Sequence, residues 1–161
     1  MFSPDELNVV MRLKYPQQKI VDWLPIHLDM LKLNEFDAEH LEIYKKNLNR
    51  QTMPGYRFTA MEHDTVYACF GMWELWPGVA ECWLIPNANI GKRVLRFHKA
   101  CLLFFEHAVN KRDIKRLQIT VRSRNDLAVQ WAERCYFNKE GLMRKWGPEY
   151  DDYWIMSRIF E

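Results

Sequence analysis

Hydrophobic residues recur at every second position in three segments at the middle of the chain. The segments span residues 56–62, 65–73 and 79–85, and turn-forming residues separate them at His63-Asp64 and Trp76-Pro77-Gly78. Period-two alternation places successive side chains on opposite faces of a sheet. This part of the chain therefore predicts a three-strand meander.

Apolar residues at helical spacing predict a long helix directly after the meander, over about residues 92–110. Its apolar face includes Val94, Phe97, Cys101 and Phe104. The other expected elements are, in chain order, a helix over 4–14, a strand over 19–24, helices over about 27–34 and 37–48 with Asp37 as the cap of the second, a strand over 117–121, a helix over 126–135, and strands near 137–144 and 151–159.

This order of elements predicts an α+β fold with a mixed central sheet flanked by helices. One domain over residues 1–161 is expected, because no repeat, low-complexity tract or linker interrupts the pattern. Residues 1–15 are expected to form an N-terminal helical extension. The sequence leaves open whether this extension docks on the domain or on a partner.

The four cysteines, Cys69, Cys82, Cys101 and Cys135, are widely separated and have apolar or aromatic neighbours. Their spacing predicts reduced, buried thiols and no metal site. No apolar run approaches the roughly 20 residues that span a bilayer, and the N-terminus lacks the basic and apolar regions of a secretory leader. We therefore expect a cytoplasmic protein without a membrane segment.

Charge is distributed unevenly along a chain whose net charge is only +2. Residues 92–124 contain ten Lys and Arg against two acidic residues, a local charge of +8. Such a segment can bind a phosphate, a cofactor or nucleic acid, or it can be a solvated helix face beside a basic turn. Both interpretations are open.

The most specific pattern, between Arg116 and Gly141, is a strand, a short helix that Asn125 is expected to cap, an aromatic residue and a return strand. Asn125, Ala128 and Phe137 match a consensus of the GCN5-related N-acetyltransferases, which has an Asn, an Ala three residues on and a Phe nine residues later. The order of elements resembles this family over essentially the whole chain. The resemblance implies a GNAT-like fold and acetyl-CoA as the cofactor.

In that family the fourth strand presents backbone groups to the pantetheine arm, and the next loop binds pyrophosphate at a helix N-terminus. The family's Gly-x-Gly step is absent here. The two cations at the helix start either replace it in part by holding an anion or are exposed basic residues tolerated at a modest cost. The resemblance assigns cofactor binding to Trp83, Leu84, Ile85, Gly91, Lys92, Arg93, Asn125 and Ala128.

The resemblance also suggests two residues for proton transfer. Glu81 lies in the fourth strand, where family members often carry a general base. The family's usual proton-donating Tyr is replaced by Ala132, so Tyr136 is the candidate that protonates the leaving thiolate. The structural alternatives are an ordinary strand carboxylate and a packing aromatic ring.

The leading hypothesis is acetyl-CoA-dependent transfer of an acyl group to a primary amine on a small molecule or a protein. The departures from the consensus also resemble acetyltransferase-fold proteins of short-tailed phages, some of which are internal virion or morphogenesis proteins. The alternative is therefore a catalytically inactive phage protein, in the host cytoplasm or the virion, that acts in virion assembly or host interaction. A base-modifying enzyme acting on nucleic acid is a third hypothesis. The sequence alone does not decide whether the chain is an enzyme.

Overall fold

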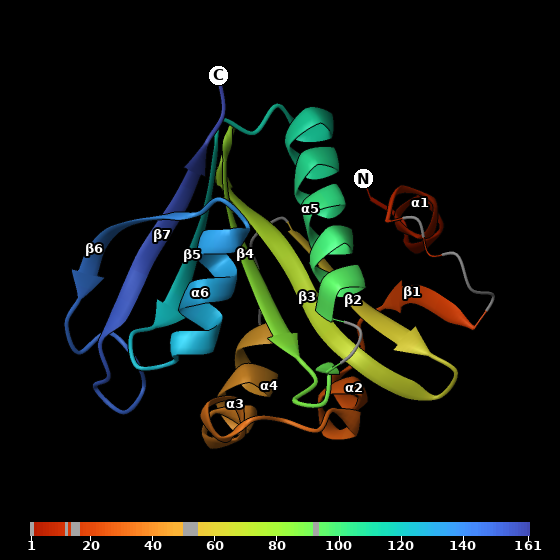
Figure 1. Ribbon diagram of the computed structural model, residues 1–161, viewed down its shortest axis with the longest axis horizontal. Helices are drawn as coiled ribbons and strands as arrows, with labels where there is room; N and C mark the ends of the chain where they lie inside the picture. Colours follow the sequence, from red (N-terminus) through yellow and green to blue (C-terminus); the bar gives the residue numbers. More distant parts are fainter. Residues whose placement is uncertain (1, 12, 14–16, 50–54, 92–93) are drawn as a thin grey trace.

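One mixed sheet crosses the molecule and is built from seven strands within the described residues (Figure 1). The computed structural model describes residues 2–11, 13, 17–49, 55–91 and 94–161. Neighbouring strands are antiparallel except β4 and β5, which run parallel. In spatial order the strands are β1 (Gln18–Asp22), β2 (Gly55–Glu62), β3 (Thr65–Trp76), β4 (Val79–Pro86), β5 (Arg116–Arg122), β7 (Tyr153–Ile159) and β6 (Asn138–Met143).

Helices cover both faces of this sheet. The long helix α5 and the short helix α6 lie over one face, and three short helices gather at the lower edge of the view against the other (Figure 1). The helices are α1 (Pro4–Val10), α2 (Pro25–Met30), α3 (Glu35–Glu39), α4 (Leu41–Asn49), α5 (Val94–Arg112) and α6 (Asp126–Arg134). The predicted α+β fold and its order of elements are confirmed.

The helix predicted over residues 37–48 is instead two helices, α3 and α4, which meet at His40. The predicted cap is also wrong, because Asn34 caps α3 and Asp37 lies three residues later, inside the helix. The Asn34 Oδ1 atom accepts a hydrogen bond from the backbone N–H of Asp37 at 2.9 Å. An Asn at this position satisfies an N–H group that the first helical turn leaves unpaired.

The alternating strands divide the hydrophobic core into two clusters. The larger cluster lies between the sheet and α5, where Phe70 packs edge to face on Phe104 and Phe105 packs edge to face on Phe137. The smaller cluster lies on the opposite face, under α2 and α4, and includes Trp23, Leu28 and Ile85. Aromatic pairs of this kind contribute about 0.5–1.5 kcal/mol beyond the area that they bury.

The N-terminal extension docks on this domain. Leu7 of α1 is fully buried in the larger cluster, together with Phe2. Glu6 accepts hydrogen bonds from Lys111 Nζ at 2.6 Å and from His107 Nε2 at 2.7 Å, which ties α1 to α5. Apolar burial and a small charge cluster therefore hold the extension in place.

The basic segment is largely neutralised by carboxylates from other elements. Arg112 pairs with Glu74 of β3, and Arg122 pairs with Asp151 and Glu39. Lys111, Arg116 and Arg124 also pair with carboxylates outside the segment, and Lys115 pairs with Asp113 of the same turn. The local excess of positive charge in the sequence is thus distributed among ion pairs, which weakens the case for a nucleic-acid surface.

The cysteines are as predicted, since all four are free and buried. None of the helices in the described ranges combines the length and the apolar character needed to cross a bilayer.

One cross-strand ion pair ties together the three strands β5, β7 and β6. The Arg116 guanidinium donates to both oxygens of Glu140 at 2.8 and 2.7 Å, and Ser157 Oγ donates to the same carboxylate at 2.6 Å. These hydrogen bonds, with that from Arg116 the larger cause, lower the pKa of Glu140 to about 2.

We expect Glu140→Gln to destabilise the protein at pH 7 by about 1 kcal/mol, a value kept small because the carboxylate is 40% exposed. A lowered folded-state pKa stabilises the fold above the unfolded value of 4.5, and this contribution is lost as the pH falls toward about 2. Urea unfolding is measured from pH 7 to pH 2.5. The difference in the free energy of unfolding between the wild type and Glu140→Gln should shrink below pH 4.5. Asp64→Asn, in the exposed β2–β3 turn, is the control, and an advantage independent of pH would contradict the ion-pair account.

Candidate functional site

The two parallel strands at the centre of the sheet separate after a short contact. They pair at only three positions, the last of which joins Glu81 of β4 to Gln118 of β5. Beyond that point β4 continues to Pro86 beside β3, and β5 continues to Arg122 beside β7. Within the described structure, residues 82–86 therefore present a strand edge toward β5 with no strand beside it.

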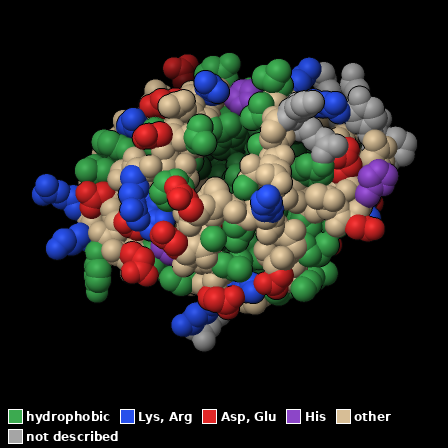
Figure 2. Space-filling model, turned by 60° about the horizontal axis from the view of Figure 1, so that its bottom comes forward, with side chains coloured by type: hydrophobic (Ala, Val, Ile, Leu, Met, Phe, Trp, Pro, Cys, Tyr) green, Lys and Arg blue, Asp and Glu red, His purple; other side chains and the backbone are tan. Residues whose placement is uncertain are grey.

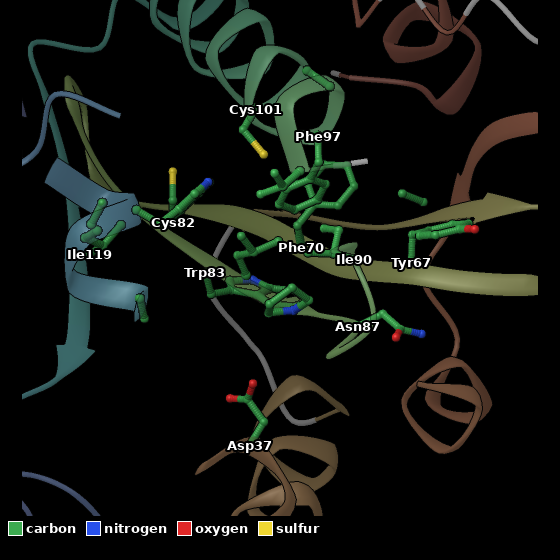
Figure 3. Close-up of a pocket in the computed structure, with 18 of the residues that line it drawn as sticks. Asp37, Tyr67, Phe70, Cys82, Trp83, Asn87, Ile90, Phe97, Cys101 and Ile119 are labelled. Carbon is green, nitrogen blue, oxygen red and sulfur yellow. The ribbon is translucent and has the colours of Figure 1, made fainter. Parts of the chain in front are cut away.

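A cavity of about 810 Å³ occupies this opening and reaches both faces of the sheet. Figure 2 shows a hollow with hydrophobic walls on this side of the molecule, and Figure 3 shows side chains entering the space from β4, β5 and α5. Cys82 and Leu84 line it on the α5 face, whereas Trp83 lines it on the face of α2–α4. The volume lies within the roughly 300–1,000 Å³ of small-molecule sites.

Aromatic side chains wall the cavity where α5 approaches α6. The rings of Phe97 and Trp131 lie 6.2 Å apart and both line the space. The Trp131 Nε1 atom is buried without a hydrogen-bond partner among the described residues. A buried donor without a partner costs free energy unless a ligand or water accepts from it. The helical pattern marked Phe97 as a core position, and sequence reasoning placed neither side chain in a site.

The predicted positions of Asn125 and Ala128 do line the cavity. Asn125 caps α6, and its Oδ1 atom accepts a hydrogen bond from the backbone N–H of Ala128 at 3.2 Å. The expected capping role is confirmed. The role of these two residues in cofactor binding stays a prediction.

The three predicted strand residues are placed differently from one another. Trp83 and Leu84 line the cavity, whereas Ile85 is buried in the smaller hydrophobic cluster outside it. The indole of Trp83 lies directly over Gly71 of β3, where an added Cβ would come within 2.7 Å of Trp83 Nε1. The absence of a side chain at Gly71 lets the ring lie against the sheet, so Trp83 forms a wall of the cavity and does not plug it.

The loop between β4 and α5 is organised by a residue that sequence reasoning passed over. Asn87 is 8% exposed; its amide donates to the Val66 carbonyl at 3.0 Å, and its Oδ1 accepts from the Asn89 N–H at 2.9 Å. An Asn directly after a strand-ending Pro is the available signal, because its side chain can close a turn on the backbone. Asn87 also lines the cavity.

The predicted phosphate-binding residues follow this loop. Gly91 has a positive φ of 41° and is exposed, with open space around its Cα. It is not among the residues that line the cavity. Lys92 and Arg93 lie outside the described residues.

The two predicted catalytic residues do not line the cavity. Glu81 lies at the last paired position before the strands separate, and its Oε2 accepts a hydrogen bond from Gln118 Nε2 at 2.9 Å. Tyr136 is 65% exposed, and its ring faces the guanidinium of Arg158 at 5.4 Å. This placement gives no support to Tyr136 as a proton donor, because the side chain is exposed and does not line the cavity.

The face of α3 and α4 adds polar side chains to the cavity that sequence reasoning did not assign to a site. Asp37 and Tyr44 line it, and the Tyr44 hydroxyl lies 3.5 Å from Asp37 Oδ1. Burial raises the pKa of Asp37, although the hydrogen bonds from Asn34 and Tyr44 and the charge of Arg122 oppose this shift. No sequence motif points to Asp37, because its distance to β4 depends on how α3 packs.

The two cysteines that line the cavity are poor nucleophiles. Burial raises the pKa of Cys82 and of Cys101, so both remain thiols near neutral pH. The thiolate is the reactive form of cysteine. Neither cysteine is therefore suited to act as a covalent nucleophile in this cavity.

No family model and no curated protein matches the sequence. Solved structures do match. One is a ribosomal L7/L12 α-N-protein acetyltransferase in complex with coenzyme A, with a TM-score of 0.64, 14% identity and coverage of 90% of this chain and 95% of that one.

Two further solved structures match with similar coverage and TM-scores. A chimeric spermidine N-acetyltransferase from Vibrio cholerae and a second source has a TM-score of 0.63 and 17% identity, and covers 89% and 96% of the two chains. An acetyltransferase of the GNAT family from Bacillus anthracis has a TM-score of 0.63 and 12% identity, and covers 91% and 96%. The resemblance read from the sequence is thereby confirmed at the level of structure, and the chain has the fold of the GNAT acetyltransferases.

Proposed function

We propose that the protein is an acetyl-CoA-dependent N-acetyltransferase that acylates a primary amine. The observation that carries the proposal is the separation of β4 and β5 after Glu81 and Gln118, which opens an 810 Å³ cavity through the sheet. Structural neighbours include enzymes that acetylate a ribosomal protein and spermidine, both of which carry amines. An open passage between two parallel strands favours the enzymatic hypothesis over the catalytically inactive alternative.

The residues present fit a pantetheine thioester. The free edge of residues 82–86 offers backbone donors and acceptors to an extended chain with amide groups, as an additional strand would. Phe97 and Trp131 supply apolar walls, and the Trp131 Nε1 atom supplies a donor that lacks a described partner. Acetyl-CoA would contribute the acetyl group on a thioester that an amine can displace.

The ends of α5 and α6 are suited to the anionic half of such a ligand. Arg96 and Arg134 line the cavity from these two helices. The start of α5 follows Gly91, where orphan backbone N–H groups and the positive end of the helix dipole favour a diphosphate. Lys92 and Arg93 belong to this proposed diphosphate site on the sequence evidence alone.

The proposed transfer is direct, within a complex that holds both substrates. The amine nitrogen forms a bond to the acetyl carbon while the carbon–sulfur bond breaks, and the sulfur leaves as a thiolate that takes up a proton from solvent. The protein would orient the two reactants, exclude water from the passage and accept a proton from the nitrogen. Glu81, at the last paired position before the strands part, is the sequence-based proposal for this proton acceptor.

The first test of this function is equilibrium binding of acetyl-CoA by calorimetry. We expect micromolar affinity for the wild type and a loss of at least about tenfold in Lys92→Ala/Arg93→Ala, because charge-assisted contacts to phosphates contribute about 1.5–3 kcal/mol. Lys46→Ala/Arg144→Ala, which removes the same two charges at exposed positions elsewhere, should bind as the wild type does. Absence of detectable heat at millimolar acetyl-CoA would eliminate the enzymatic proposal.

The second test addresses Glu81. If its carboxylate accepts the amine proton, Glu81→Gln should lower kcat by about 10²–10⁴-fold and leave the Kd for acetyl-CoA unchanged. Gln118→Leu removes the hydrogen bond to Glu81 but keeps the carboxylate, so its kcat should fall far less. A Glu81→Gln variant within twofold of the wild-type kcat would leave Glu81 with a purely structural role between β4 and β5.

A further inference from the structure

The part of the cavity that faces α3 and α4 has a chemistry of its own. Its polar and aromatic walls come from four different elements, on the sheet face opposite α5 and α6 (Figure 3). The lining residues in question are Glu35, Phe36, Asp37, Tyr44, Trp83 and Tyr153. Of these residues, the proposed cofactor contacts use only the backbone of Trp83, in the free edge of residues 82–86.

Asp37 retains hydrogen-bonding capacity toward this space. Its Oδ2 atom accepts from Asn34 Nδ2 at 2.8 Å, whereas its Oδ1 atom has only a long contact of 3.5 Å with the Tyr44 hydroxyl. An ionised carboxylate offers about four lone-pair positions. The described contacts therefore leave room for a further donor, and in Figure 3 the carboxylate lies on the side of α3 that faces Trp83.

The nearby cation does not neutralise Asp37. Arg122 lines the same region, but its guanidinium already binds Asp151, lies 2.9 Å from Glu39 Oε2 and stacks over the ring of Phe36 at 5.6 Å. Two carboxylates thus share its single charge. Asp37 is therefore an additional carboxylate of this region, and Glu35 also lines the cavity.

The cavity is consequently polarised along its length. Arg96 and Arg134 line it from α5 and α6, whereas Asp37 and Glu35 line it from α3. Opposite charges at the two ends favour an anionic ligand at one and a cationic ligand at the other.

The aromatic wall beside Asp37 suits the same cation. Trp83 stacks on Trp73 at 6.3 Å, with 29° between the ring planes, and exposes part of its indole to the cavity. An ammonium group is attracted to the face of an indole, most strongly where water is excluded. A neutral alcohol would gain neither this attraction nor a charge-assisted hydrogen bond.

We propose that Asp37 and the indole of Trp83 form the acceptor subsite, in which Asp37 binds the ammonium group of a primary amine. The nitrogen of this group attacks the acetyl carbon only after it has given a proton to the acceptor proposed above. This inference deepens the proposed function and rests on it. The shared chemistry is a primary ammonium carried either by a polyamine or by the N-terminus of a peptide. Tyr44 makes a long contact with the carboxylate from the side of α4.

The test separates charge from structure at residue 37. Asp37→Asn keeps the size of the side chain and an oxygen that can accept from Asn34, but it removes the negative charge. Asp37→Ser is a second charge-removing variant, whose hydroxyl can also accept that hydrogen bond. Glu42→Gln is the matched control, because it removes one exposed carboxylate of α4 that does not line the cavity.

Calorimetric titration and steady-state kinetics use spermidine in one arm and a peptide with a free N-terminal serine in the other. We expect Asp37→Asn to weaken binding of the cognate amine, and to raise its KM, by about tenfold or more with a smaller change in kcat. Glu42→Gln should match the wild type. The arm in which the change occurs identifies the source of the ammonium.

Amine affinity and KM within twofold of the wild type in both Asp37 variants would overturn the proposal. Acetyl-CoA binding is measured on the same samples. A wild type that binds spermidine or peptide through Asp37 but no acetyl-CoA would refute the proposed function and leave the cation subsite standing. Normal acetyl transfer that is insensitive to residue 37 would support the proposed function and refute the cation subsite.

Discussion

The early end of the pairing between β4 and β5 is the constraint on which the site depends. A parallel pair that continued past Glu81 and Gln118 would satisfy its backbone groups internally and close the sheet. Separation instead leaves one edge of β4 free at the centre of the protein, flanked by helices on both faces. The strands can part because each keeps its other neighbour, β3 for β4 and β7 for β5, so neither loses its place in the sheet.

Large aromatic side chains keep this opening from collapsing. Trp83 lies on Gly71, and Phe97 packs near Trp131, so bulky rings line the space from both faces without filling it. The cost of an open cavity near the core is offset by the well-packed cluster beneath α5. The larger cluster thus stabilises the fold, whereas the aromatic walls shape the passage.

Most charged side chains of the basic segment for which a partner is described form local ion pairs. The basic residues that follow one another in the sequence are taken up individually by carboxylates of β3, β6, α3 and the segment before β7. The cavity is lined by arginines of α5 and α6 and by carboxylates of α3. An arrangement of this kind suits two ligands of opposite charge that must approach each other in the middle.

Local pattern in the sequence determined the elements and much of their order, because period-two and helical spacing report which face of each segment is buried. It also determined the Asn125 cap, since capping needs only residues within one turn. The assignment of Asp37 as a cap failed because Asn34 competes for the same turn. Only the tertiary structure decided which residues surround the cavity. The proximity of Asp37 to Trp83 and of Phe97 to Trp131 depends on helix docking and on where two strands part, and no spacing along the chain encodes either.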